Sequence, residues 1–283
     1  MMKSEASLAG FDMKTMENQK PAYQELPLSR NRRMMAATLD VARQQNNIQA
    51  MIEVDVSEPR RLIQEHRRKT GERLSFTAYV VTCLARAVAE HPQMNAFRRG
   101  RNLILLENVT ISVLVERELD GEMMPENLGI RFAQKKTLMQ IHDQIRCAQE
   151  QADDELGGLS GTTWIRFIPG FLLRTFVRLA SRNVSMMDRF GAVGVTAVGM
   201  FGSKNEAMWL LPLVGGATVA VAVGGIVERP CMQNGRLENH EHLCLTVTFN
   251  HEIVDGAPAA RFLKTFSELL KSGDLIHDEA GDV

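Results

Sequence analysis

A predicted strand that ends at a histidine and is followed by a loop and a helix constrains the fold most strongly. Residues 243–249 alternate large apolar side chains with smaller ones, which is typical of a β-strand with one buried face. Apolar side chains then recur at helical spacing from Phe262 to Leu270, and Pro258 suits a first helical turn. A strand end holds a side chain rigidly, and imidazole titrates near neutral pH. His251, at this strand end, is therefore a candidate general base.

A single histidine at a strand end is more often structural than catalytic, so the rest of the chain must decide between the two interpretations. The 283 residues can bury a sizeable core as one large domain or two small ones. A formal net charge of -1 gives no indication of nucleic-acid binding, and no such partner is expected. The four cysteines form no C-x-x-C pair and no secretory signal opens the chain, which predicts a reducing, cytoplasmic setting.

One uncharged stretch, residues 207–227, has about the length of a membrane span. It contains Pro212 and two pairs of glycines, and Thr218 to Val223 form a β-branched and alanine-rich run. Such a run favours a turn followed by a buried strand over a membrane helix.

Other apolar patterns predict an α/β protein, in which strands and helices alternate. Residues 75–90 are apolar on nearly all helical faces, which predicts a buried helix. Residues 103–106 and 109–115 are each expected to form a strand, and we expect these two strands to pair with each other. Thr137 followed by Gln140 predicts a capping box at the start of a further helix.

Several short blocks follow one another in the order found in a known enzyme family. The blocks are Pro27-Leu28-Ser29 with Arg32, residues 90–96, Gly194 to Gly202, Val223 to Pro230, and His251-x-x-x-Asp255-Gly256. Together they resemble the catalytic domain of the dihydrolipoyl acyltransferases of 2-oxoacid dehydrogenase complexes, which share a fold with chloramphenicol acetyltransferase. The resemblance implies a two-layer α/β sandwich with a mixed sheet. It also implies a homotrimer, or a higher oligomer built from trimers, with active sites between subunits.

The resemblance also divides the chain into regions. Residues 1–25 are expected to be a flexible N-terminal arm, 26–276 the catalytic domain and 277–283 a tail. Residues 161–190 look like an insertion, because the resembled family has only a short connection there. Within them, a basic stripe and an apolar face share one predicted helix. This helix could contact a membrane surface or a partner, cover an acyl channel, or pack on its own domain.

The function implied by the resemblance is transfer of an acyl group between coenzyme A and a thiol, amine or hydroxyl acceptor. Acyl-CoA is then a substrate, and no cofactor is expected to bind tightly. His251 is expected to be the general base, and Thr196, which stands at the family's serine, the donor to the oxyanion. Asp255 is expected to form a structural ion pair with Arg32. The other expected substrate contacts are Gly199, Gly256 and Asn250.

The sequence does not identify the acceptor, and two alternatives to an active acyltransferase have to be considered: an inactive protein of the same fold and a metal site. The N-terminal arm is too short for a lipoyl domain, so the acceptor could be a small molecule or a lipoyl group on a separate protein. Ala197, which replaces the family's asparagine, and Pro125, which departs from a family turn, keep open a catalytically inactive assembly or binding protein. His240 and His242 could face one side, but no ligand set at familiar metal spacing completes a site, so no metal is expected.

Overall fold

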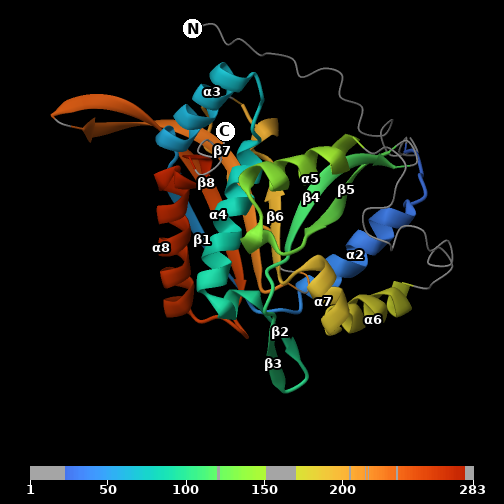
Figure 1. Ribbon diagram of the computed structural model, residues 1–283. Coiled ribbons are helices and arrows are strands. Elements are labelled where there is room, and N and C mark those ends of the chain that lie inside the picture. Colours follow the sequence, from blue (N-terminus) through green and yellow to red (C-terminus); the bar gives the residue numbers. More distant parts are fainter. Residues whose placement is uncertain are drawn as a thin grey trace, which may run out of the picture.

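The computed structural model describes residues 23–119, 122–150, 170–203, 205–213, 215, 217–233 and 235–277. A six-stranded mixed sheet lies behind a layer of helices (Figure 1). Its strands, in spatial order, are β1 (Asn47–Asp55), β8 (Arg236–Asn250), β7 (Val219–Gln233), β6 (Val193–Ala197), β4 (Ile111–Leu119) and β5 (Glu122–Ile130). The covering helices are α3 (Ser57–Thr70), α4 (Phe76–Glu90), α5 (Leu138–Glu150) and α8 (Gly256–Ser272), with the short α9 (Asp274–His277) after them. The predicted two-layer α/β sandwich with a mixed sheet is confirmed.

The core lies between this helical layer and one face of the sheet. Helix α4 is buried on nearly all sides, as predicted, and the Ser75 hydroxyl caps it by accepting a hydrogen bond from the Ala78 N–H at 3.3 Å. Helix α8 packs on β8 through a perpendicular contact between the rings of Phe249 and Phe262, whose centroids are 5.9 Å apart. The burial of this apolar face fixes α8, and with it the loop before α8, against the end of β8.

The predicted capping box and the predicted buried strand in the uncharged stretch are also confirmed. Thr137 and Gln140 form the reciprocal capping box: Thr137 Oγ1 accepts from the Gln140 N–H at 3.2 Å, and Gln140 Oε1 accepts from the Thr137 N–H at 3.1 Å. The uncharged stretch ends in the buried half of β7. No helix in the described part of the chain is long and apolar enough to span a membrane.

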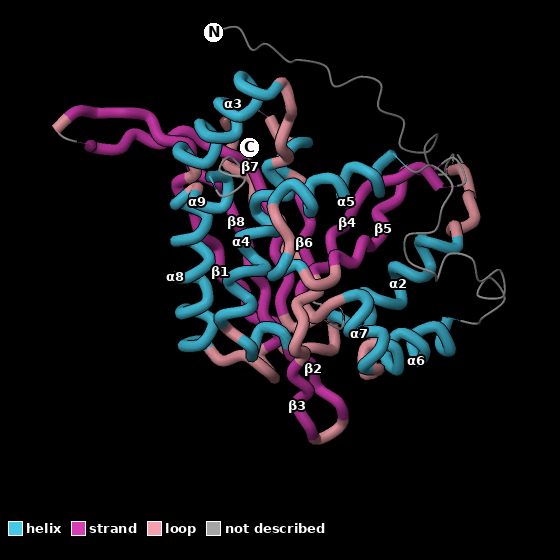
Figure 2. The backbone as a smooth tube through the Cα atoms, in the orientation of Figure 1, coloured by secondary structure: helices cyan, strands magenta, loops and turns pink. Residues whose placement is uncertain are grey.

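The predicted pairing of residues 103–106 with 109–115 is wrong. Residues 102–105 form β3 (Asn102–Leu105), which pairs with β2 (Ala96–Arg99) in a separate hairpin, whereas β4 pairs with β5 and β6. Gly100, with φ +64°, lies in the left-handed region and allows the two-residue turn that closes this hairpin. The hairpin projects from one end of the sheet (Figure 2).

The described part of the predicted insertion packs on the N-terminal helix of the domain. Helix α6 (Gly170–Ala180), which precedes the short α7 (Val184–Phe190), lies along α2 (Arg30–Ala42). Leu173 is buried against Ala37, and Arg174 forms an ion pair with Asp40 at 2.5 Å. Arg178 also bonds Gln44 of the loop after α2. These contacts favour the interpretation in which α6 packs on its own domain.

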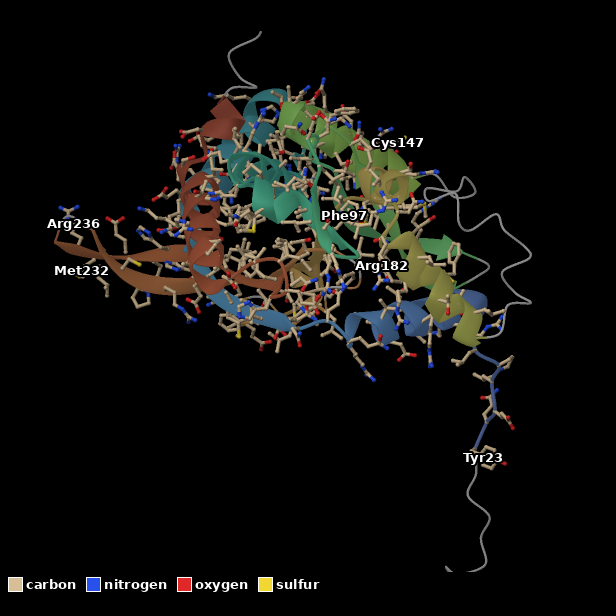
Figure 3. All side chains as sticks on the ribbon, turned by 90° about the horizontal axis from the view of Figure 1, so that it is seen from below. Tyr23, Phe97, Cys147, Arg182, Met232 and Arg236 are labelled. Atoms are coloured by element: carbon tan, nitrogen blue, oxygen red, sulfur yellow. The ribbon has the colours of Figure 1, made fainter. Side chains whose placement is uncertain are left out.

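The ends of β7 and β8 extend beyond the sheet as an arm, with Met232 and Arg236 at its tip (Figure 3). Two contacts to β1 hold the base of the arm: an ion pair of Arg229 with Glu53 at 2.8 Å, and a hydrogen bond between His240 Nδ1 and Asp55 Oδ2 at 2.6 Å. Burial alone raises the pKa of Asp55, but hydrogen bonds from His240 and Ser57 outweigh it and leave this pKa lowered.

A close stack of backbone segments fixes the turn after β6. A Cβ on Gly199 would lie 1.9 Å from the Gly224 carbonyl oxygen, and one on Gly224 would lie 1.9 Å from the Met208 carbonyl oxygen. Gly199 thus has a packing role in the structure. At the bulge of β7 between Val223 and Ile226, the Gly225 N–H donates to the Met208 carbonyl at 3.0 Å, so the segment around Met208 packs directly against the strand.

We predict that Gly224→Ala lowers the free energy of unfolding by about 1–3 kcal/mol, because backbone atoms would have to move apart. The matched control is Gly194→Ala, also in a strand, where the nearest atom to an added Cβ is 3.8 Å away. Thermal and denaturant unfolding of both variants measures the difference. Equal stability of the two variants would contradict the close stack.

Candidate active site

The loop that carries His251 is held by a buried asparagine. The Asn250 side chain is almost fully buried, and its Oδ1 accepts a hydrogen bond from the Glu252 N–H at 3.0 Å. The Asn250 carbonyl accepts from the N–H groups of Ile253 and Val254, both at 3.0 Å. The His251 N–H donates to the Asn46 carbonyl at 2.7 Å, which ties the loop to the start of β1. Asn250, expected to contact substrate, is therefore used in positioning the loop.

The imidazole of His251 is oriented by its own loop. Its Nδ1 lies 3.1 Å from the Val254 carbonyl oxygen. Because a carbonyl oxygen can only accept, the neutral ring must carry its hydrogen on Nδ1, which leaves Nε2 with a lone pair. The side chain is 44% exposed, so a reacting group can approach it. This is the arrangement that a general base requires.

Asp255 lies beside the same ring nitrogen. Its Oδ1 is 3.7 Å from His251 Nδ1, and the side chain is 85% exposed. The Asp255 carboxylate therefore lies near enough to attract a positive charge on the His251 ring. Because Asp255 faces solvent, this attraction is partly screened in the single chain.

The predicted ion pair between Arg32 and Asp255 is not present in the single chain. Helix α2 begins at Arg30 on the side of the molecule far from the end of β8 and runs towards the start of β1 (Figure 1), so its first turn, which includes Arg32, lies at the distant end. Among the described residues, the basic group beside Asp255 is His251. Gly256 opens α8, and nothing lies within 4 Å of a Cβ placed there. Steric contacts within the chain therefore do not explain why the motif has a glycine at this position.

Thr196 lies on β6, on the face of the sheet away from the helices. Val193 and Val195 belong to the buried core, and side chains alternate along a strand, so Thr196 points to the opposite face. Its hydroxyl makes no hydrogen bond with the residues that the structure describes. The hydroxyl can therefore serve as a donor to a substrate oxygen.

Strand register places Thr196 and His251 at different ends of the sheet. Thr196 is level with Ala222 of β7, which in turn is level with Thr246 of β8. His251 lies five residues beyond Thr246, so the two sites are separated by about 19 Å, from about 3.3 Å per residue and 4.8 Å per strand. The two side chains of one chain are too far apart to act on one carbonyl group.

Cys83 and Cys244 are both buried, so neither is a candidate nucleophile. Burial raises the pKa of the Cys83 thiol to about 12, and it also raises the pKa of Cys244. Both thiols are therefore protonated packing groups near neutral pH. His242 Nε2 faces Cys231 Sγ at 3.7 Å, and the described residues contain no group of three or more potential metal ligands.

One contact near His251 was missed by the sequence reasoning. Arg98, at the end of β2, donates from Nη1 to Glu252 Oε2 at 2.7 Å. Glu252 follows His251 directly, so the hairpin of β2 and β3 is tied to the loop of the candidate base. The partners are separated by 154 positions, and no sequence pattern connects them.

Comparison with known proteins gives one family. The family model described as 2-oxoacid dehydrogenases acyltransferase (catalytic domain) matches residues 20–159 and 182–277. The succinyltransferase component of the 2-oxoglutarate dehydrogenase complex of Staphylococcus saprophyticus is 26% identical over 204 residues. That match covers 71% of this chain but 40% of the relative, so this chain spans less than two thirds of the relative's length.

Two solved structures have the same fold. The dihydrolipoamide acetyltransferase of Azotobacter vinelandii is 17% identical, with a TM-score of 0.68, covering 96% of this chain and 99% of that one. The cubic core of a pyruvate dehydrogenase multienzyme complex is also 17% identical, with a TM-score of 0.67 and the same two coverages.

We predict that Asn250→Ala loosens the His251 loop, because the Glu252 N–H loses its acceptor. A lost hydrogen bond of about 1 kcal/mol would accelerate amide hydrogen exchange in residues 250–256 about fivefold. Asn239→Ala, an exposed asparagine on the arm, is the control and should leave exchange in this loop unchanged. Unchanged exchange in Asn250→Ala would show that the side chain does not hold the loop.

Proposed function

We propose, on the premise that the chain belongs to the family of 2-oxoacid dehydrogenase acyltransferase catalytic domains, that it transfers an acyl group between coenzyme A and an acceptor thiol. The observation that carries the proposal is the hydrogen bond from His251 Nδ1 to the Val254 carbonyl, which leaves Nε2 available as a base. A dihydrolipoyl group is the proposed acceptor, because the staphylococcal relative is a dihydrolipoyllysine succinyltransferase component. Acyl-CoA enters as a substrate rather than as a bound cofactor.

In the proposed reaction, each of the two side chains has one role. His251 Nε2 accepts the proton of the acceptor S–H as the sulfur attacks the thioester carbonyl carbon. The negative charge moves to the carbonyl oxygen, which receives a hydrogen bond from the Thr196 hydroxyl. The bond between this carbon and the sulfur of CoA then breaks, and the leaving thiolate takes the proton from the imidazolium. Transfer is direct within a ternary complex, and no acyl-enzyme forms.

This reaction requires two copies of the chain. Because Thr196 and His251 lie about 19 Å apart in one copy, His251 of one copy must face Thr196 of another. We propose a homotrimer, in which each subunit supplies its histidine to one neighbour and its threonine to the other. The similarity of the fold to a protein that assembles into a cubic core supports an assembly of this kind. Larger assemblies of trimers are compatible with the same contacts.

Asp255 has a proposed part in this site. In the catalytic mechanism of the Azotobacter acetyltransferase, the roles investigated include those of a histidine and of an asparagine four positions later, the spacing of His251 and Asp255. We propose that Asp255 stabilises the protonated ring and that Arg32 of a neighbouring copy pairs with it. The start of α2 lies away from its own His251 loop, which supports a contact with another copy. A cytoplasmic setting is part of the proposal, and the four cysteines are unpaired in the structure.

We predict that His251→Ala lowers turnover with acyl-CoA and dihydrolipoamide about 10²–10⁴-fold. Thr196→Ala should lower it about 10²–10³-fold, because the oxyanion loses its donor. Release of CoA measures turnover, and gel filtration checks that both variants keep the oligomeric state of the wild type. Undiminished activity in His251→Ala would exclude this residue as the base. A wild-type chain without turnover would favour the inactive assembly protein.

Mixed oligomers test the shared site. In a trimer assembled at random from equal amounts of His251→Ala and Thr196→Ala chains, about one quarter of the sites combine an intact histidine with an intact threonine. Co-refolding the two variants should therefore restore about a quarter of the wild-type activity. If the mixture is no more active than the separate variants, the site does not lie between two copies.

A further inference from the structure

The hairpin of β2 and β3 projects past the end of the sheet at which β8 stops (Figures 1 and 2). Its main apolar anchor lies on one face. Phe97 and Ile104 are cross-strand neighbours, and Phe97 is buried in a small apolar cluster with Met187 and Ala192. The anchored face holds the hairpin in a fixed position, so its tip stands away from the body of the protein.

Apart from Ala96, which is fully buried, the other face of the hairpin is bare and carries apolar and basic groups. Arg98 lies opposite Leu103, and Ala96 lies opposite Leu105, so these side chains share one face. Leu103 is 45% exposed and Leu105 is 51% exposed. Exposed leucines beside arginine are typical of a surface that another protein covers.

The charge of the hairpin is of one sign. Arg98, Arg99 and Arg101 are all exposed, and no acidic residue occurs between positions 96 and 106. The acidic side chain that faces the hairpin is Glu252, and its charge is matched by Arg98. Asp255 lies beside His251 on the loop itself. Arg99 and Arg101 therefore leave a positive charge at the tip.

The bare face is connected to the candidate base. Arg98 bonds Glu252, and the Glu252 N–H bonds the side chain of Asn250, so two hydrogen bonds link the hairpin to the residues on either side of His251. A partner that docks on this face is placed next to the imidazole. Groups carried by such a partner can reach Nε2 through a short flexible arm.

We infer that the β2–β3 hairpin is the docking surface for a small acidic carrier domain, which presents its acyl or dithiol group to His251. A convex projection with exposed leucines suits a protein surface, whereas a small anion requires a concave site that surrounds it. The arginines attract the acidic domain and orient it, and the leucines contribute apolar contact. The inference rests on the proposed function, and it adds the surface that selects a protein-borne acceptor over a small one.

The test compares two acceptors in the full-length protein: a reduced lipoyl domain of negative net charge, and free dihydrolipoamide. Arg99→Glu/Arg101→Glu should lower kcat/KM for the domain about tenfold or more at low salt, because attraction becomes repulsion. For dihydrolipoamide, kcat/KM should stay within about twofold, since the small acceptor does not need the hairpin. Raising the salt concentration should reduce the difference between the wild type and the variant.

The matched control is Arg67→Glu/Arg68→Glu, which reverses two exposed charges on α3 at the opposite end of the molecule. It should leave kcat/KM for both acceptors unchanged. Equal losses with both acceptors in the hairpin variant would overturn the inference, as would no loss with the domain.

Direct binding separates failure of this inference from failure of the proposed function. If the wild type turns over neither acceptor, the proposed function fails, but titration with the lipoyl domain still tests the hairpin. A Kd raised about tenfold in the hairpin variant and unchanged in the α3 variant supports the docking surface. Equal Kd values in the two variants contradict it, as does binding of the hairpin to anionic lipid vesicles in preference to the domain.

Discussion

The antiparallel pairing of β7 with β8 is the constraint on which the rest of the structure depends. Because β8 is antiparallel to β7 and β6, it ends at the end of the sheet where those two strands begin. His251 therefore follows β8 at this end of the sheet, whereas Thr196 lies towards the opposite end of β6. A one-residue shift of this register would turn every buried side chain of β8 to the opposite face, so the hydrophobic pattern fixes it firmly. The packing of the core therefore sets the distance between His251 and Thr196 within one chain.

Under the proposed function, that separation means that the active site is shared between two copies of the chain. Each chain completes one half by itself: the His251 loop is held by Asn250 and Asn46, and its ring by the Val254 carbonyl. The other half is the Thr196 hydroxyl on the sheet face that the helices leave uncovered. Neither half can stabilise an acyl transition state alone, since a base without an oxyanion donor leaves the developing charge unmatched. Assembly and catalysis are therefore coupled in this account.

Sequence reasoning recovers those parts of the structure that depend on local pattern. Alternation predicts β8, continuous apolar character predicts the burial of α4, and ordered short blocks identify the family and fold. It fails where a distant contact decides the outcome. The strand at 102–105 pairs with β2 because Gly100 closes a tight turn, and this arginine-rich turn lacks the usual hairpin signal. The contact of Arg98 with Glu252 and the carbonyl acceptor of His251 are consequences of packing that no pattern encodes.

The most direct test is a crystal structure of the assembled protein with a CoA thioester bound. His251 Nε2 of one copy and the Thr196 hydroxyl of its neighbour should lie on either side of the thioester carbonyl, each within about 3.5 Å of its target atom. A thioester bound in a site that contains neither residue would contradict the shared active site. So would an assembly in which no Thr196 of any copy approaches a His251.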